Sequence, residues 1–461
     1  MNVASRTPRR RDAIAESVRG LSSGTSADLR WTESLWTTIR FANGRIHQPH
    51  HEWNVNLSYR FADGNRLGTS TTGDTSPAGI DEVVRSARSL ARVAPKEPKF
   101  PGFPTDSAPR PRPVAFSAAT ARISPEEATR IAERILTAAA SRAPGARIAG
   151  VVNIGTERRR VLNSSGLDRS TRTSAAQASV LVDRPDRDPP VSGWSEGAHF
   201  DAAKLAPEKI GREAAERVAT TAPVSVAPGA YRVVLRDSAV ASIIEFLAAL
   251  GFGANGEVEG WSCLRRLRGK SVAPPAIDLV DDARSRGTLP GAIDYEGVAT
   301  RRTPLLEHGV ARPAVTDVVT SGRLGRPLTG HAVPPESPSG EWGPVPTHLL
   351  LAPGDASEEE LIRSTRRGLL VTRFHYVRVV DPGRGLITGM TRDGTYRIEN
   401  GEVVQPVRNL RFTESVLTTL KGTELVGRAT RAHNTDGRGG FTSTCPAILS
   451  RSFRFTSATL F

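Results

Sequence analysis

Histidines and acidic side chains are densest in the segment His-Gln-Pro-His-His-Glu, which holds His47, His50, His51 and Glu52. Imidazole nitrogens and carboxylates are ligands that zinc accepts, with metal–nitrogen distances of roughly 2 Å. In an extended segment His47 and His51 share a face but lie about 13 Å apart, and His50 points to the opposite face. We therefore expect a polar strand edge here. A metal site is the alternative, if Pro49 bends the chain enough to bring the imidazoles together.

A second group of polar side chains lies in the segment Arg-Phe-His-Tyr-Val-Arg, which begins at Arg373. The segment is predicted to be a strand, and alternation along it places Arg373 and His375 on one face and Phe374, Tyr376 and Arg378 on the other. Such a strand lines a cleft or forms an exposed sheet face, and the sequence leaves both possibilities open.

Two glycine motifs match known chemistry only by letter. Residues 251–256 read G-x-G-x-x-G, but a dinucleotide fingerprint needs a strand before it, and the preceding residues read as a helix. We therefore expect Gly251 to end that helix. Residues 20–24 read G-x-S-x-G, but the polar segment before them cannot supply the buried strand of a nucleophile elbow.

Apolar spacing and turn residues predict the elements of the N-terminal half. Asn43-Gly44 and Asp63-Gly64 predict two hairpin turns, because the central residues of such turns tolerate positive φ. A helix is expected over about 80–93. Another is expected after Ser124, a suitable N-cap, with Pro125 at its first position.

Further elements follow along the chain. We expect a loop around Trp194, a helix over about 207–220 and a strand over 231–235. The next helix is expected to be capped by Asp237 or Ser238, and one more lies around 357–364.

The chain has 461 residues, which suggests about two to four domains. Four segments are predicted: a basic flexible arm over 1–30, an N-terminal α+β domain over 31–103, a central region with a linker, helix and strands over 104–222, and a β-rich C-terminal domain over 223–461. The predicted fold class is α+β, with hairpins and helices in an N-terminal α/β region before the β-rich domain.

The net charge of +14 comes from 62 basic and 48 acidic residues, and nearly all the basic residues are arginine. This bias is typical of a GC-rich codon supply, so it is weak evidence for a binding partner. The run Arg9–Arg11 could bind phosphate groups, but no zinc-finger or RNA-binding signature accompanies it. No apolar run is long enough to cross a bilayer, and no signal peptide is recognised. Two cysteines exclude a disulfide framework, so we expect a cytoplasmic protein without a membrane partner.

Several segments resemble the TldD/PmbA (TldD/TldE) family of bacterial metallopeptidase subunits, and the resemblance covers about residues 30–461. The segments that carry it are DYEGVATRRT (294–303), RGLLV (367–371), YRIENGE (396–402), PVRNL (406–410), and, near the N-terminus, RFAN (40–43) with IHQ (46–48). Each segment alone is modest evidence, but their order and spacing together are specific.

Within this family the TldD type carries His-Glu-x-x-x-His on the helix that opens the C-terminal domain, together with a distal cysteine. Two imidazoles and a thiolate leave one zinc position for water, and the glutamate acts as general base. The matching helix here, residues 242–252, contains no histidine, and Glu245 is its one carboxylate. Cys445 falls in the closing strand instead of the earlier glycine-rich loop, and Cys263 is expected to pack as a small buried hydrophobe.

The resemblance therefore implies the TldE type: a non-catalytic subunit that holds no metal and assembles with a TldD-like chain bearing zinc and the base. The implied substrate is an unfolded or precursor peptide, bound in extended form by β-augmentation. Arg373, His375 and Tyr376 are our candidates for lining the peptide groove. One alternative is a standalone metallopeptidase with a relocated site that uses His375 or the histidines of 47–51. A second alternative, which rests on charge alone, is a nucleic-acid-binding or gyrase-associated regulator.

Overall fold

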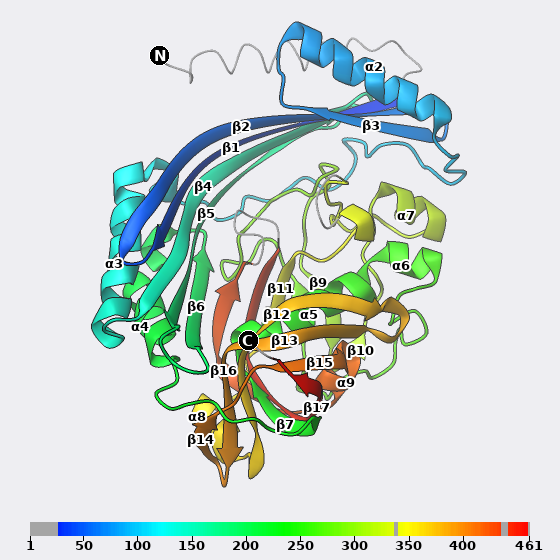
Figure 1. The fold of residues 1–461 in the computed structure, drawn as a ribbon. Helices are drawn as coiled ribbons and strands as arrows, with labels where there is room; N and C mark the ends of the chain where they lie inside the picture. Colours follow the sequence, from blue (N-terminus) through cyan, green and yellow to red (C-terminus); the bar gives the residue numbers. More distant parts are fainter. Residues whose placement is uncertain (1–25, 336–339, 435–440, 460–461) are drawn as a thin grey trace.

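Two β-sheets dominate the computed structural model, which describes residues 26–335, 340–434 and 441–459. A six-stranded antiparallel sheet, the arch, curves over a β-rich body (Figure 1). The arch has the order β3-β2-β1-β4-β5-β6. Its strands are β1 (Ser26–Ala42), β2 (Arg45–Asp63), β3 (Arg66–Thr72), β4 (Arg147–Asn163), β5 (Asp168–Arg184) and β6 (Val191–His199).

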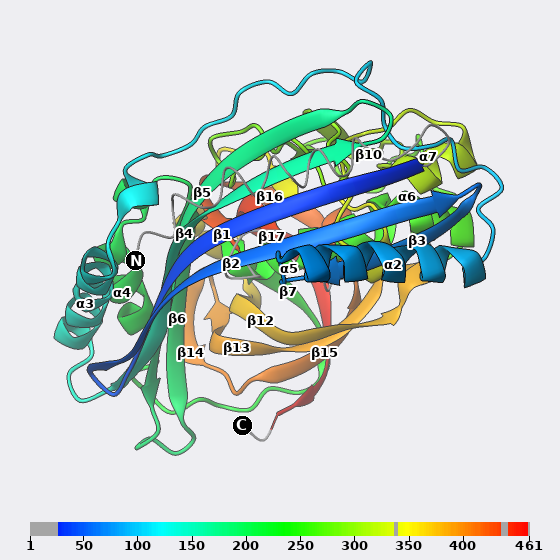
Figure 2. The same cartoon turned by 90° about the horizontal axis from the view of Figure 1, so that it is seen from above.

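Four strands of the arch are 17 to 19 residues long, which corresponds to roughly 55–65 Å. A sheet of this length carries a separate helical layer at each end of its outer face (Figures 1 and 2). Helix α2 (Pro77–Val93) covers one end, and α3 (Pro125–Arg142) with α4 (Pro207–Glu216) covers the other. Two hydrophobic cores result, one around Trp31 and Tyr59 and the other around Ile135 and Val180.

The body, residues 229–458, is built around an eleven-stranded sheet. Five of its strands, in the order β17-β15-β13-β12-β7, close into a barrel because β7 also pairs with β17. Phe374, Phe412, Phe453 and Phe455 pack together in its core, with ring centroids 4.5 to 5.3 Å apart. The body strands are β7 (Gly229–Leu235), β8 (Leu279–Asp281), β9 (Thr303–Glu307), β10 (Val310–Ala311), β11 (His348–Leu351), β12 (Arg367–Asp381), β13 (Leu386–Glu399), β14 (Glu402–Pro406), β15 (Leu410–Ser415), β16 (Thr423–His433) and β17 (Thr442–Ala458).

Helix α5 (Asp237–Phe252) follows β7 directly and packs against β12 and β17. Apolar residues occur on every side of this helix, and eleven of its sixteen residues are buried. A helix that is apolar on all sides is typically buried in a core. Because α5 is packed in this way, it holds the side chains of its first turn in place. The smaller helices of the body are α6 (Ala254–Glu259), α7 (Val318–Leu324), α8 (Glu358–Arg363) and α9 (Val416–Lys421).

The predicted α+β class is confirmed, and several predicted local signals have their expected roles. Ser124 caps α3, and its hydroxyl accepts a hydrogen bond from the backbone N–H of Glu127, whose carboxylate reciprocates. The first hairpin turns at Asn43 and Gly44, where φ is +51° and +75°. Among the described helices, none combines the length and apolar character needed to cross a membrane.

Three local predictions are wrong. Trp194 lies in β6 instead of a loop, because β6 completes the edge of the arch beside β5. Helix α5 has Arg236 at its N-cap, and the carboxylate of Asp237 instead engages side chains of the body. Gly251 lies within α5, where a Cβ atom would come 2.8 Å from Leu264, so its small size serves packing.

The predicted segment boundaries differ from the sheets. Strand β1 begins at Ser26, so residues 26–30 of the predicted arm belong to the sheet. The arch takes strands from both 31–103 and 104–222, because β1 pairs with β2 on one side and with β4 on the other. Residues 1–25, which include the arginine run and the G-x-S-x-G match, lie outside the described residues.

Candidate functional site

The first turn of α5 lies where the body meets β6 of the arch, and charged side chains from both sides converge there. Arg431 on β16 contacts the Asp237 carboxylate with its Nε at 3.2 Å and the Glu213 carboxylate of α4 with its Nη2 at 2.6 Å. The same guanidinium donates to the Ser195 hydroxyl on β6. These contacts hold the start of α5 against the arch.

His433 lies between two carboxylates in this cluster. Its Nδ1 is 2.9 Å from Oε1 of Glu196, and its Nε2 is 3.9 Å from Oδ2 of Asp237. Burial by itself would lower the pKa of His433, but the hydrogen bond and charge of Glu196 outweigh it and raise the pKa above its ordinary value. Burial would likewise raise the pKa of Glu196, yet His433 and Arg373 lower it. The geometry thus places the His433 ring between two acidic side chains, with its Nδ1 engaged by Glu196.

The polar side chains near the middle of α5 are also engaged. The Ser443 hydroxyl on β17 donates to Glu245 at 2.6 Å. The Cys445 thiol donates to the backbone carbonyl of Asp237 at 3.2 Å, and burial raises the pKa of this thiol well above its ordinary value. Zinc binds thiolate, imidazole and carboxylate groups. A neutral thiol and one hydrogen-bonded carboxylate, with no histidine on the helix, do not fit a zinc site.

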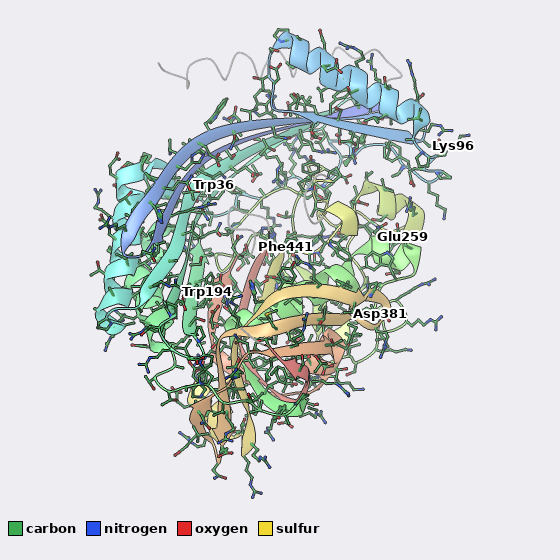
Figure 3. All side chains as sticks on the ribbon, viewed as in Figure 1. Trp36, Lys96, Trp194, Glu259, Asp381 and Phe441 are labelled. Carbon is green, nitrogen blue, oxygen red and sulfur yellow. The ribbon has the colours of Figure 1, made fainter. Side chains whose placement is uncertain are left out.

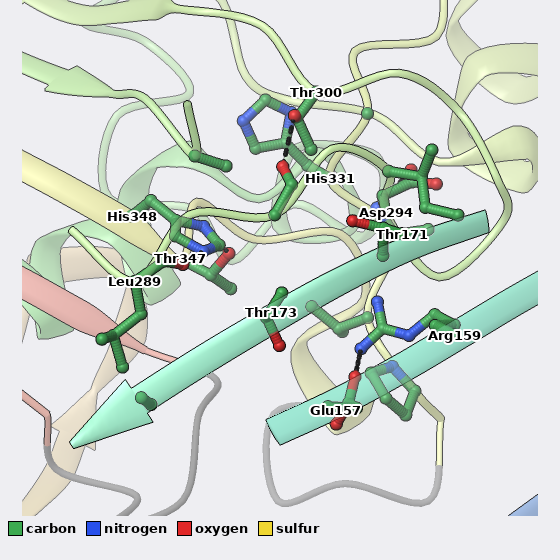
Figure 4. Close-up of a pocket in the computed structure, with 18 of the residues that line it drawn as sticks. Glu157, Arg159, Thr171, Thr173, Leu289, Asp294, Thr300, His331, Thr347 and His348 are labelled. Atoms are coloured by element: carbon green, nitrogen blue, oxygen red, sulfur yellow. Dashed lines mark hydrogen bonds and ion pairs between the residues drawn. The ribbon is translucent and has the colours of Figure 1, made fainter. Parts of the chain in front are cut away.

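A cavity of about 150 Å³ lies between the inner face of the arch and the loops of the body (Figure 4). Glu157 and Arg159 on β4 and Thr171 and Thr173 on β5 line it from the arch, with Glu157 accepting from Arg159 at 2.7 Å. Trp36 on β1 also lines it from the sheet (Figure 3). Binding pockets for drug-sized ligands are typically about 300–1,000 Å³, so this cavity has room for one peptide side chain.

The body side of the cavity presents a buried acid–histidine group. Asp281 accepts from the backbone N–H of His348 at 2.7 Å, and its Oδ1 lies 3.2 Å from Nε2 of His331. Burial would raise the pKa of Asp281, but the two histidines lower it. Burial lowers the pKa of His348, whose Nε2 donates to the Leu289 carbonyl at 3.1 Å. The buried Asp281 carboxylate is thus held by the His331 ring and by the backbone of His348 on this wall of the cavity.

The segment Asp294-Tyr295-Glu296, whose Asp294 also lines the cavity, joins the body to the arch. Glu296 accepts from Arg60 of β2 at 2.8 Å and from the backbone N–H of Val318 at 2.8 Å. Burial raises the pKa of Glu296 to about 7, although Arg60 opposes this. Burial also raises the pKa of Asp294 to about 6, even though three backbone N–H groups donate to its carboxylate. The segment therefore clamps the two layers together.

The three residues predicted to line a peptide groove lie on β12, and nothing in the structure tests that role. The Arg373 guanidinium stacks on Trp194 of β6 at 4.0 Å and pairs with Asp393 at 2.5 Å, which joins β12 to the arch. His375 is half-buried, and burial, with Arg392 and Arg373 nearby, lowers its pKa. Tyr376 is 66% exposed.

The predicted alternation along this strand is wrong at Tyr376, which should share a face with Phe374. Phe374 is buried in the barrel, whereas Tyr376 faces solvent. A β-bulge explains the difference, because three residue steps from His375 to Arg378 oppose two steps on β13. Tyr376 adopts φ of +55° at this bulge, a conformation that is costly for an aromatic residue.

The histidine segment of β2 is extended, as expected for a polar strand. His51 shares a hydrogen bond with Thr37 on β1 at 2.8 Å, while His50 pairs with Glu52 at 2.9 Å. Within 26–335, 340–434 and 441–459, no group of three or more His, Cys, Asp or Glu side chains could hold a metal ion. The structure does not bring His375 and the histidines of 47–51 together into one described site.

Local sequence motifs do not reveal His331, His348 or His433. Each is isolated in the sequence, and its carboxylate partner lies 50 residues or more away along the chain. The family-like segment DYEGVATRRT (294–303) does draw attention to Asp294, Tyr295 and Glu296, but it does not indicate which residues of the arch they contact.

Family models match most of the chain. The PmbA/TldA metallopeptidase domain 1 matches residues 27–91, the central domain matches 120–221, and the C-terminal domain matches 228–457. The chain belongs to the PmbA/TldD metallopeptidase family. The arch therefore combines domain 1 with the central domain, and the body is the C-terminal domain of the family.

Similar proteins agree with this assignment. A protein of Methanothermobacter thermautotrophicus named metalloprotease is 29% identical over 223 residues, which is 48% of this chain and 48% of that relative. The chain thus matches about half the length of that relative. Metalloprotease PmbA of Escherichia coli O157:H7 is 22% identical over 449 residues, 93% of this chain and 94% of that protein.

Among solved structures, TldE from Thermococcus kodakarensis has the same fold. It superposes with a TM-score of 0.85 at 20% identity, covering 97% of this chain and all of that one. At this identity the likeness establishes the fold alone.

Proposed function

We propose that this chain is the non-catalytic, TldE-like subunit of a heterodimeric TldD/TldE zinc metallopeptidase that cleaves unfolded or precursor peptides. A TldD-like partner supplies the zinc and the general base. This chain supplies part of the cavity wall and of the peptide groove, and the assembly works in the cytoplasm.

The observation that carries this proposal is the chemistry of α5 and its surroundings. The family's metal-binding helix corresponds to a helix that here carries no histidine. Its one mid-helix carboxylate, Glu245, accepts from Ser443, and the nearby Cys445 thiol is buried as a neutral donor. The imidazole of His433 is held by Glu196. Glu245, Cys445 and His433, as the structure describes them, are thus each engaged in another contact.

The inner surface of the arch supports a role in peptide binding. The cavity beside β4 and β5 is large enough for a side chain, and it offers hydroxyl, carboxylate and imidazole groups. Strand β12 carries Arg373, His375 and Tyr376, and it contacts the arch where Arg373 lies over the ring of Trp194. These residues remain our proposed groove lining.

Metal content and peptidase activity test the proposal. We expect the purified full-length chain to contain substoichiometric zinc by mass spectrometry and to leave fluorescein-labelled casein intact. Adding a TldD-like chain with an intact His-Glu-x-x-x-His motif should start cleavage. Stoichiometric zinc together with cleavage by the isolated chain would refute the proposal.

A matched pair of substitutions locates the general base. Glu245→Gln keeps an acceptor for Ser443, so we expect the mixed complex to retain its activity. The same Glu-to-Gln change in the motif of the TldD-like chain should abolish cleavage. Loss of activity from Glu245→Gln, with normal folding and assembly, would place a catalytic carboxylate in this chain.

A further inference from the structure

The outer edge of β2 is open over a long stretch. Strand β1 pairs with β2 from Arg45 to Ala62, whereas β3 pairs only with Leu57–Asp63. Within the described part of the chain, no strand pairs with the outer edge of residues 45–56. Every side chain of this stretch is exposed or half-buried, and Trp53 is 47% exposed. Natural proteins seldom leave so long an edge strand without a covering element or a binding partner.

Proline fixes which backbone groups face outward. Pro49 lies opposite Ile39 of β1 and has no N–H to donate, so its backbone faces away from β1. Backbone direction alternates along a strand, so the N–H and C=O groups of His51, Trp53 and Val55 also face outward. In the same alternation the backbone of Leu57 faces outward, and Leu57 does pair on that side with Thr72 of β3.

The side chains of this edge complement one another across a two-fold axis. In antiparallel pairing centred on His51, Pro49 lies opposite Trp53 of the second copy, which joins two apolar rings. His50 then lies opposite Glu52, and Gln48 lies opposite Asn54. Pairing centred on Glu52 would instead oppose two carboxylates, which is destabilising.

We propose that two copies of this chain associate edge to edge through residues 48–54 of β2, antiparallel and centred on His51. The arches of the two copies then form one continuous twelve-stranded sheet. Pro49 supplies no N–H on the outer edge, which limits the ladder to a short central segment. This self-association is independent of the proposed heterodimer.

The test is the mass of the full-length chain in solution, by size-exclusion chromatography with light scattering. A dimer of the 49.4 kDa chain is expected at micromolar concentration. Trp53→Glu and His51→Pro should each weaken dimerisation at least tenfold. His51→Pro removes an outward N–H together with the side-chain contact to Thr37, so His51→Ala, which removes only that contact, is its control and should leave the dimer intact. None of these variants should change the circular dichroism spectrum. Val93→Glu replaces another exposed apolar residue, on α2, and should leave the dimer intact.

Charge exchange tests the register. Glu52→Lys should weaken the dimer, because a lysine then faces His50 of the second copy. The double variant His50→Glu/Glu52→Lys should restore the dimer. A monomeric wild type, dimers unaffected by both edge variants, or failure of the double variant to restore association would overturn the proposal. So would dimers that form only after removal of residues 1–25, or an edge that pairs only with a TldD-like chain.

Discussion

Removing the Arg60 side chain should destabilise the joint between arch and body strongly. Its guanidinium donates to Asp28 at 2.7 Å and to Glu296 at 2.8 Å, and both carboxylates are almost fully buried. Arg60→Ala removes the guanidinium that pairs with Glu296, while Asp28 keeps its pair with Arg30. Breaking a buried ion pair from one side typically costs about 3–5 kcal/mol. At about 2.1 cal/mol/K of unfolding entropy per residue, a chain of 461 residues loses about 1 °C per kcal/mol, so the unfolding midpoint should fall by roughly 3–5 °C at pH 8.

The pH dependence of this loss identifies its cause. Burial raises the pKa of Glu296 from 4.5 to about 7, so the folded state holds this proton more tightly than the unfolded state. The stability from that difference is complete below pH 4.5 and is lost as pH rises through about 7. Without Arg60, whose charge lowers this pKa, the value rises further. A protonated Glu296 needs no cation, so the penalty of Arg60→Ala should shrink between pH 8 and pH 5.5.

Thermal unfolding followed by near-ultraviolet circular dichroism at both pH values measures this effect. Arg85→Ala is the control, because it removes an arginine whose pair with Glu82 is exposed on α2, and it should leave the midpoint unchanged. A loss below about 1 kcal/mol for Arg60→Ala, the size typical of a surface pair, would refute the buried-clamp interpretation. A penalty that grows toward pH 5.5 would refute the role of Glu296.

Two further predictions concern backbone and thiol chemistry. Gly309→Ala should lower the unfolding midpoint clearly, because Gly309 has φ of +74° and a Cβ atom there would overlap the Ala273 carbonyl. Gly44 has nearly the same φ of +75° but open space around it, so Gly44→Ala should cost only the backbone strain. Equal losses of the two variants in thermal unfolding would contradict this prediction. Native protein should react with Ellman's reagent far more slowly than urea-unfolded protein. Burial raises the pKa of the Cys445 thiol, which donates to the backbone carbonyl of Asp237, and burial raises the pKa of Cys263 to about 12. Fast labelling of either native thiol would contradict that assignment.

Local signals in the sequence determined much of the secondary structure. The capping box at Ser124, the hairpin at Asn43-Gly44 and the start of the acidic helix at Ser357 depend on residues within a few positions of one another. Such contacts form in the same way whatever lies elsewhere in the chain. The lack of histidine on residues 242–252 was also readable directly, because a helical metal motif lies within one short segment.

The sites where distant segments meet were decided only by the tertiary structure. His433 finds Glu196 across 237 residues, and Arg60 finds Glu296 across 236. Whether Asp237 caps its helix or binds Arg431 depends on the arrival of β16 beside α5, which no local pattern encodes. The bulge that turns Tyr376 outward likewise depends on pairing with β13. Local hydrogen bonding specified the elements, whereas burial of charge between layers specified the joints.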